Sequence, residues 1–141
     1  HLTRLSAWVQ LSPFIFRRAL PMSDRNALIV DDHATNRLLG SALLKKLGWT
    51  TQEADCGEKA LQLAANQAFR LVLLDISMPG LSGEETCARL RQIPMDPPLH
   101  ILAYTAHAYA EDRARLLAAG FDEILVKPIN RQRIEELISH L

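Results

Sequence analysis

The chain has 141 residues, of which 48% are hydrophobic and 23% are charged, a composition that suits one compact globular domain rather than a disordered or repeat polypeptide. Acidic and basic residues balance at 16 each, so the broad positive charge that direct nucleic-acid binding would need is absent. No apolar run approaches the roughly 20 residues of a membrane-spanning helix, so we expect no membrane insertion.

The first 21 residues differ from the rest of the chain. They mix aromatic and arginine side chains and show neither a helical nor an alternating period, so we expect residues 1–21 to lie outside the domain. Three origins stay open for this segment: residues added by cloning, an extension upstream of an initiator at Met22, and a linker from a preceding domain. A signal peptide is not favoured, because no small-residue cleavage site follows a proper apolar core. The domain is predicted over residues 22–141.

From Asn26 onward, short β-rich apolar runs alternate with segments of helical period. This alternation is typical of an α/β fold with a doubly wound, five-stranded parallel sheet, the (βα)5 or flavodoxin-like order. In chain order, the predicted strands are 26–31 (NALIVD), 49–54 (WTTQEA), 70–75 (RLVLLD), 100–105 (HILAYT) and 122–127 (DEILVK).

A helix is predicted after each strand, with its recurring apolar residues facing the core. Gly48 is expected to end the first helix, and Pro128 is expected to open the last one. In chain order, the helices are marked by Leu38, Leu39, Ala42, Leu43 and Leu47; by Ala60, Leu61, Ala64, Ala65 and Ala68; by residues from about Glu84 to Ile93; by Leu116 and Leu117 before Gly120; and by Ile134, Leu137, Ile138 and Leu141.

Polar residues mark the ends of four predicted strands. They are Asp31 with Asp32, Asp75, Thr105 and Lys127, from the first, third, fourth and fifth strands. Because ligands of open parallel sheets bind at the carboxyl ends of the strands, we expect these side chains to converge in one crevice.

Three carboxylates within a few ångströms repel one another and stay ionised only with cations among them. Oxygen ligands favour a hard ion, and Mg²⁺ fits best because it takes few carboxylates and keeps positions for water and phosphate oxygens; Mn²⁺ could replace it. With Asp31 and Asp32 at the metal, Asp75 is left as a carboxylate nucleophile toward a phosphoryl group. Lys127 and the Thr105 hydroxyl would then neutralise charge on the phosphoryl oxygens.

The segments VDDHATNRLL, LVLLDISMPGLSG, ILAYTAHA and FDEILVKPI together resemble the successive motifs of receiver domains of two-component signalling, over residues 26–141. The VDDHATNR and TAHA stretches are most similar to receivers of hybrid sensor histidine kinases. The resemblance implies a response regulator domain of a phosphorelay, which is not a separate enzyme but assists its own phosphorylation and dephosphorylation.

For the site, the resemblance implies that Asp75 is the phosphoacceptor and that Asp31, Asp32, Asp75 and the backbone carbonyl of Ser77 bind Mg²⁺. Thr105 would move toward the phosphoryl group, and Lys127 would pair with it across a cis bond to Pro128. Ser77 and His107 occupy the positions that tune dephosphorylation. One residue departs from the family pattern, because Ile124 stands where many receivers carry the aromatic residue of the switch; Tyr104 should point to the opposite face and cannot simply replace it.

The partners implied are a histidine kinase or histidine phosphotransfer protein as donor and a downstream effector protein or domain. A homodimer through the fourth helix, fifth strand and fifth helix is an open possibility, and so is the choice between a stand-alone receiver and part of a hybrid kinase. Cys56 and Cys87 lack metal-ligand spacing and are typical of reduced thiols, which favours a cytoplasmic location.

Other interpretations compete with this one. Single residues at strand ends are often helix caps, and His33, His100, His107 and His140 are interpreted mainly as surface or loop residues. A haloacid-dehalogenase phosphatase would carry its nucleophile in a D-x-D pattern on the first strand, where this chain has adjacent aspartates. A flavodoxin-like cofactor binder would need a less acidic first loop. The remaining alternative is a receiver-like module that binds proteins without being phosphorylated.

Overall fold

The computed structural model describes residues 25–141 of the chain. The segment 1–21 and residues 22–24 of the predicted domain lie outside the described residues, so the predicted boundary is not tested.

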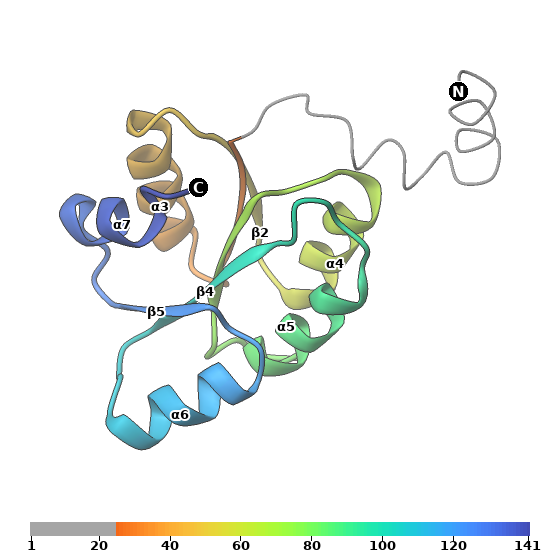
Figure 1. Ribbon diagram of the computed structural model, residues 1–141, viewed down its shortest axis with the longest axis vertical. Coiled ribbons are helices and arrows are strands. Elements are labelled where there is room, and N and C mark those ends of the chain that lie inside the picture. The colour runs from red at the N-terminus through yellow and green to blue at the C-terminus, as the bar shows by residue number, and fades with distance from the viewer. Residues whose placement is uncertain (1–24) are drawn as a thin grey trace, which may run out of the picture.

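A single five-stranded parallel sheet forms the centre of the domain, in the order β2-β1-β3-β4-β5. The strand order reverses beside β1, which is the topology of a doubly wound sheet, and the predicted fold class is confirmed. The ribbon shows the strands running through the middle of the molecule with helices on both sides (Figure 1). The strands are β1 Asn26–Val30, β2 Thr50–Ala54, β3 Leu71–Asp75, β4 His100–Thr105 and β5 Glu123–Val126.

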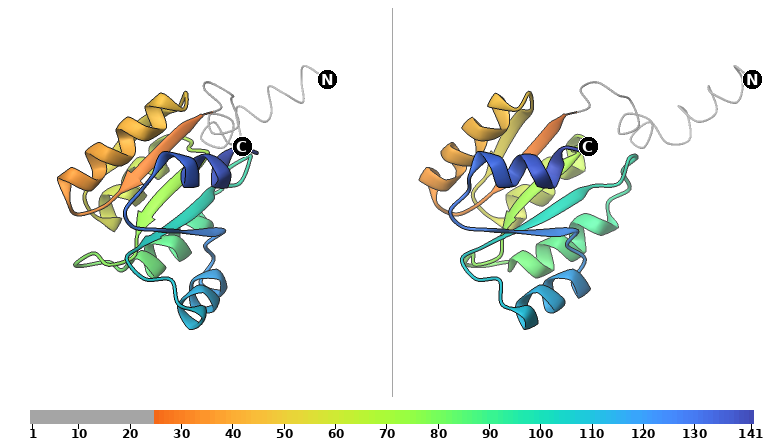
Figure 2. Two further views of the ribbon diagram at one scale, coloured as in Figure 1. Left: turned by 90° about the vertical axis from the view of Figure 1, so that its left-hand side faces the viewer. Right: turned by 60° about the vertical axis from the view of Figure 1, so that its left-hand side comes forward.

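Within residues 25–141, five helices cover the two faces of this sheet. Two of them, the first and the last, pack on one face, and the other three pack on the opposite face (Figures 1 and 2). This division follows from right-handed crossovers on either side of β1. The helices are α3 Ala34–Lys46, α4 Gly57–Asn66, α5 Gly83–Gln92, α6 Ala110–Ala118 and α7 Arg131–Ile138.

The strands place alternate residues in two separate cores. In β4, Ile101 and Ala103 pack under α4, α5 and α6, whereas Leu102 and Tyr104 pack under α3 and α7. Ile124 belongs to the first core and Tyr104 to the second, so the two residues lie on opposite faces of the sheet, as the alternation of a strand requires. Burial on both faces also explains why the central strands are continuously apolar in sequence.

The start of the last helix differs from the sequence-based expectation. Pro128 does not open it, because α7 begins at Arg131 and is capped by Asn130, whose Oδ1 accepts a hydrogen bond from the Arg133 N–H at 2.8 Å. Leu141 lies beyond the end of this helix. An asparagine side chain that satisfies an orphan N–H fixes a helix start more strongly than a proline that only restricts φ.

The apolar face predicted for the first helix is wrong in part, because Leu43 and Leu47 pack against the core but Leu38 and Leu39 do not. Leu38 is 69% exposed and Leu39 is 45% exposed, whereas Gly40, Ser41 and Leu44 are buried. Small side chains let α3 approach the sheet closely, and a Cβ built on Gly40 would already lie 3.5 Å from Leu73 Cδ2. Of the residues predicted to face the core, Leu38, Leu39 and Ala42 therefore turn outward.

Candidate functional site

Acidic and basic side chains meet at the carboxyl end of the sheet. Asp31 directly follows β1, Asp75 is the last residue of β3, and Lys127 directly follows β5. Because β1 and β3 are parallel neighbours in register, their ends bring the first two carboxylates together. Asp32, the neighbour of Asp31, joins them, so residues from three distant segments of the chain share one small region.

The two central carboxylates are buried, and one lysine serves both. Asp31 and Asp75 are each 1% exposed. Lys127 Nζ lies 3.4 Å from Asp75 Oδ1 and 3.8 Å from Asp31 Oδ2. A single ammonium group cannot neutralise two buried carboxylates, so the region keeps a strong attraction for further positive charge.

Local hydrogen bonds hold Asp31 in place. Its Oδ1 accepts from the His33 N–H at 2.8 Å, and its Oδ2 accepts from Asn36 Nδ2 at 3.1 Å. Arg37 Nη1 donates to the Asp31 carbonyl oxygen at 2.8 Å, while its Nε donates to Glu53 on β2. The loop after β1 is therefore fixed by the first turn of the helix that follows it.

Asp75 is held by its own loop. Its Oδ1 accepts from the Ser77 N–H at 3.0 Å. Burial raises the pKa of the Asp75 carboxyl above its ordinary value, and the neighbouring Asp31 charge raises it further, against the opposing effects of Ser77 and Lys127. Burial and the neighbouring negative charge thus destabilise the ionised form of this carboxylate, and a bound cation would stabilise it.

The donor set suits a hard divalent cation. Asp31, Asp32, His33 and Asp75 each offer one ligand atom, and these atoms all lie within 4.8 Å of one another. Asp32 Oδ1 is buried and has no hydrogen-bond partner among residues 25–141, although His33 Nδ1 lies 3.1 Å away. An unsatisfied buried carboxylate oxygen beside two buried aspartates fits the ligand preference of Mg²⁺.

Thr105 lies at the adjacent strand end but turns toward its own loop. Its hydroxyl donates to the His107 carbonyl oxygen at 2.9 Å and accepts from the His107 N–H at 3.1 Å. Within the described part of the chain, no hydrogen bond joins Thr105 to Asp75. The His107 ring is exposed and stacks on Tyr109, with ring centroids 5.9 Å apart.

On the other face of the sheet, the Tyr104 ring lies beside the ammonium group of Lys127. The Lys127 ammonium lies 4.9 Å from the centroid of the Tyr104 ring, and the Tyr104 hydroxyl accepts from the Ile129 N–H at 3.2 Å. The Lys127–Pro128 peptide bond between these contacts is cis. Tyr104 therefore supports the position of the lysine from below, a role that the sequence alone did not indicate.

Sequence reasoning also missed the roles of Asn36, Arg37 and His33 around Asp31. A usable signal was available, because polar side chains two to six residues after a buried strand-end aspartate can reach its carboxylate or carbonyl group. His33 is exposed, as predicted for a loop residue, but its ring also lies 3.4 Å from Asp31 Oδ1.

The sheet order, the buried aspartate pair and the lysine define a pattern that can be compared with known proteins. A family model described as the response regulator receiver domain matches residues 27–139. The chain belongs to the response regulator receiver family. The prediction of a receiver domain, made from the four motifs, is confirmed.

Curated relatives of this receiver include sensor kinases. Signal transduction histidine-protein kinase BarA of Escherichia coli (strain K12) is 35% identical over 124 residues, which cover 84% of this chain and 14% of BarA. The chain thus spans about a seventh of that relative's length. The predicted likeness to receivers of hybrid sensor kinases is confirmed.

Two solved structures are similar to this receiver. The receiver domain of sensor histidine kinase PA1611 from Pseudomonas aeruginosa PAO1, with a magnesium ion in its active site cleft, is 28% identical with a TM-score of 0.73, and the match covers 82% of this chain and 94% of that one. A chain from the co-crystal structure of the Saccharomyces cerevisiae phosphotransfer protein Ypd1 and the receiver of Ssk1 is 25% identical with a TM-score of 0.74, over 82% and 86% of the two chains.

The described residues contain no helix that is both long and apolar enough to cross a membrane.

Proposed function

We propose that this receiver accepts a phosphoryl group on Asp75 from a phosphohistidine donor in a Mg²⁺-dependent reaction and thereby changes its affinity for another protein. The observation that carries the proposal is the convergence of Asp31, Asp32 and Lys127 on a buried Asp75. A purely structural role would not explain why three acidic side chains share one pocket at considerable electrostatic cost.

In the transfer, a carboxylate oxygen of Asp75 attacks the phosphorus atom and forms a P–O bond while the P–N bond to the donor imidazole breaks. The bonding electrons stay on the imidazole nitrogen, which ends as neutral histidine after any protonation by water. The product is an acyl phosphate on Asp75. No general base on this chain is needed, because the carboxylate is already ionised.

The neighbouring residues have separate roles in this proposal. Asp31, Asp32, Asp75 and the Ser77 carbonyl oxygen would hold Mg²⁺, or Mn²⁺ in its place, which supplies positive charge beside the phosphoryl oxygens. Formation of the acyl phosphate removes the carboxylate charge of Asp75, so Lys127 leaves its ion pair with that residue and pairs with a second phosphoryl oxygen. The Thr105 hydroxyl leaves the His107 loop to bind a third oxygen, and this movement transmits the change to α6.

Residues next to the acyl phosphate control its hydrolysis. Ser77 and His107 border the path of a water molecule that would attack the acyl phosphate. Both belong to loops that are fixed by hydrogen bonds to Asp75 and Thr105, respectively. Changing either residue should therefore alter the lifetime of the phosphoryl group more than the rate of its formation.

The exposed leucines of α3 support a docking role for the donor. Leu38 and Leu39 follow the Asp31 loop by less than two helical turns and are exposed at 69% and 45%. Adjacent exposed apolar side chains can mark a protein–protein interaction site, and these two lie beside the phosphoacceptor site. We assign this face to the histidine kinase or histidine phosphotransfer protein that presents the phosphohistidine.

The proposed phosphorylation is tested by intact-protein mass spectrometry after incubation with acetyl phosphate, with and without Mg²⁺. Wild type should gain one phosphoryl mass only with the metal, and Asp75→Asn should gain none. Asp96→Asn, which changes an exposed aspartate in the loop before β4, serves as the matched control. No adduct under any condition, or one that survives Asp75→Asn, would favour the phosphorylation-independent binding module instead.

The docking face is tested separately, with a histidine phosphotransfer domain that phosphorylates the wild type. Leu38→Asp should slow transfer from that protein donor at least tenfold but leave labelling by acetyl phosphate unchanged. Leu117→Asp alters an equally isolated leucine, 50% exposed on α6, and should affect neither reaction. Equal slowing with both donors would mean that the substitution damages the site itself.

The remaining sequence-based predictions are a cytoplasmic location, a downstream effector, and a homodimer through α6, β5 and α7. Leu117 and Val126 are exposed on this last surface. These predictions stay proposals, as does the choice between a stand-alone receiver and part of a hybrid kinase.

A further inference from the structure

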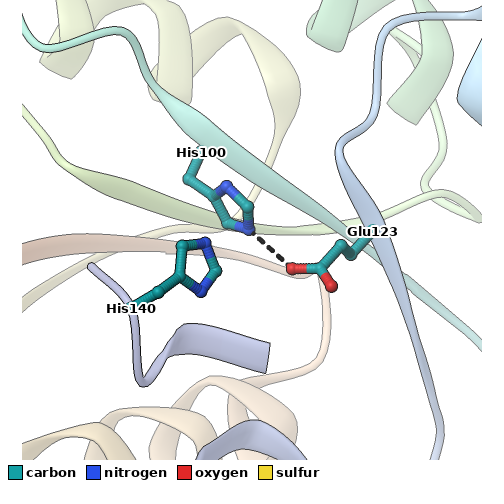
Figure 3. Close-up of side chains that lie close together, drawn as sticks. All are labelled: His100, Glu123 and His140. Atoms are coloured by element: carbon teal, nitrogen blue, oxygen red, sulfur yellow. Dashed lines mark hydrogen bonds and ion pairs between the residues drawn. The ribbon is translucent and has the colours of Figure 1, made fainter. Parts of the chain in front are cut away.

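A second group of metal-ligating side chains lies at the opposite end of the sheet from Asp75. His100 is the first residue of β4, Glu123 is the first residue of β5, and His140 follows the end of α7. Figure 3 shows the two imidazole rings and the carboxylate gathered around one small space. None of these residues has a part in the proposed phosphoryl transfer.

The strand register explains why these side chains meet. Leu102 in β4 and Leu125 in β5 belong to the core under α7. His100 and Glu123 lie two residues before these leucines, so alternation sends their side chains to the same face. The chain leaving α7 passes over this edge and brings His140 to them, a convergence that sequence spacing alone does not reveal.

The contacts are close. His100 Nε2 lies 2.9 Å from Glu123 Oε2, and the His100 and His140 rings meet edge to face with centroids 5.3 Å apart. The three ligand atoms lie within 4.8 Å of one another. His100 is largely buried, with 15% of its side chain exposed, which corrects its interpretation as a surface or loop histidine.

Asp122 lies near the Nδ1 side of the His100 ring. Its Oδ2 lies 3.8 Å from His100 Nδ1, accepts from the Ile101 N–H at 2.7 Å, and pairs with Arg91. A carboxylate near the distal nitrogen of a ligating histidine favours the tautomer that leaves Nε2 for the metal, and at 3.8 Å Asp122 acts here through its charge and not through a hydrogen bond. The carboxylate is itself held by Arg91 and the backbone, so this support is rigid.

We propose that His100, Glu123 and His140 form a binding site for a divalent transition metal of the Zn²⁺ type. Two imidazoles and one carboxylate are a ligand set that suits zinc, whereas Mg²⁺ prefers oxygen ligands alone. Water would complete the tetrahedron.

The geometry requires little movement. Zinc bonds of about 2.0–2.1 Å place tetrahedral ligands about 3.3 Å apart, so the pair of His100 and Glu123 is already near its bound spacing. The widest separation must shrink by about 1–2 Å, and His140, an exposed residue at the end of the described chain, can supply that shift by rotation of its side chain.

A metal at this site would tie the end of α7 to the starts of β4 and β5. Ligands that bind only the folded state stabilise it in proportion to the logarithm of their concentration over Kd. Zinc should therefore raise the unfolding temperature of the receiver through three elements that surround the second core.

The test is isothermal titration of the full chain with ZnCl2 in excess Mg²⁺, which suppresses zinc binding at the aspartates. Every protein carries His1→Gln, because His1 lies outside the described residues and could itself bind zinc. Against this background, His140→Gln should lose one zinc equivalent or bind it at least tenfold more weakly. His107→Gln, which removes an exposed histidine from the opposite end of β4, should bind like the background protein.

Two further readouts separate metal binding from a structural role of the cluster. Zinc should raise the unfolding temperature of the background protein but not that of His140→Gln, and it should shift the imidazole NMR signals of His100 and His140 together. Labelling by acetyl phosphate should be the same in the background protein and in His140→Gln. Loss of zinc binding and loss of phosphorylation are therefore measured separately, and each proposal can fail without the other. Equal zinc binding by the background protein and His140→Gln, or unchanged signals for His100, would overturn the site and leave a hydrogen-bonded histidine cluster.

Discussion

Two glycine-to-alanine substitutions should change stability in opposite directions. A Cβ on Gly83, at the start of α5, would lie 2.5 Å from Ile76 Cα and 2.8 Å from the Asp75 carbonyl oxygen. A Cβ on Gly40, inside α3, would lie 3.5 Å from Leu73 Cδ2, an ordinary van der Waals contact. Both positions are buried in helices. The pair therefore separates helix propensity from close packing against the backbone of the phosphoacceptor loop.

The expected magnitudes follow from these contacts. Gly40→Ala gains about 0.8–1.0 kcal/mol of helix propensity, and burial of its methyl group adds at most about 0.8 kcal/mol. Gly83→Ala must move backbone atoms, and overpacking of this kind costs about 1–3 kcal/mol or more, which exceeds the propensity gain in a first turn. Gly40→Ala should thus be more stable than wild type by about 1 kcal/mol, and Gly83→Ala less stable by about 1–3 kcal/mol.

Urea unfolding followed by circular dichroism measures both changes. Acetyl phosphate labelling provides a second readout, since a displaced Asp75 loop should slow phosphorylation of Gly83→Ala but not of Gly40→Ala. If Gly83→Ala proved as stable as Gly40→Ala, the close approach of α5 to the Asp75 loop would not be a constraint, and the reasoning would be refuted.

Three other predictions concern buried groups. Asp75→Asn should stabilise the domain at pH values above the raised pKa of Asp75, because burial and Asp31 disfavour the charged carboxylate. The wild type loses stability as the pH rises from the ordinary aspartate pKa of about 3.9 through the raised pKa. In urea titrations with EDTA, the two proteins should therefore converge in stability at acid pH. Burial raises the pKa of Cys87 to about 11, so iodoacetamide at mildly alkaline pH should modify the half-buried Cys56 first. Equal labelling of the two cysteines in peptide mapping would contradict this. Tyr104→Phe removes the acceptor of a buried backbone N–H and should lower the free energy of unfolding by about 1–2 kcal/mol; an unchanged urea midpoint would mean that this hydrogen bond contributes nothing.

Much of the fold could be predicted because its signals are local. Strand β4 coincides with the predicted run 100–105, and the other strands differ by one residue at one or both ends. Continuous apolar runs predict buried parallel strands, and their ends point to Asp31, Asp75 and Lys127 without any structure. The predicted apolar face of α3 was wrong at Leu38 and Leu39, because a helix can pack on a sheet through glycine and serine.

Sequence by itself determined the order of strands and helices, the family, and the residues that gather at the carboxyl edge of the sheet, because each depends on periodicity and on where strands end. Only the tertiary structure decided that the Thr105 hydroxyl turns to its own loop, that Tyr104 lies beneath Lys127, and that His100 meets His140. Contacts of this kind depend on strand register, on helix position and on side-chain rotamers, which are set by packing between distant segments and leave no mark in local sequence.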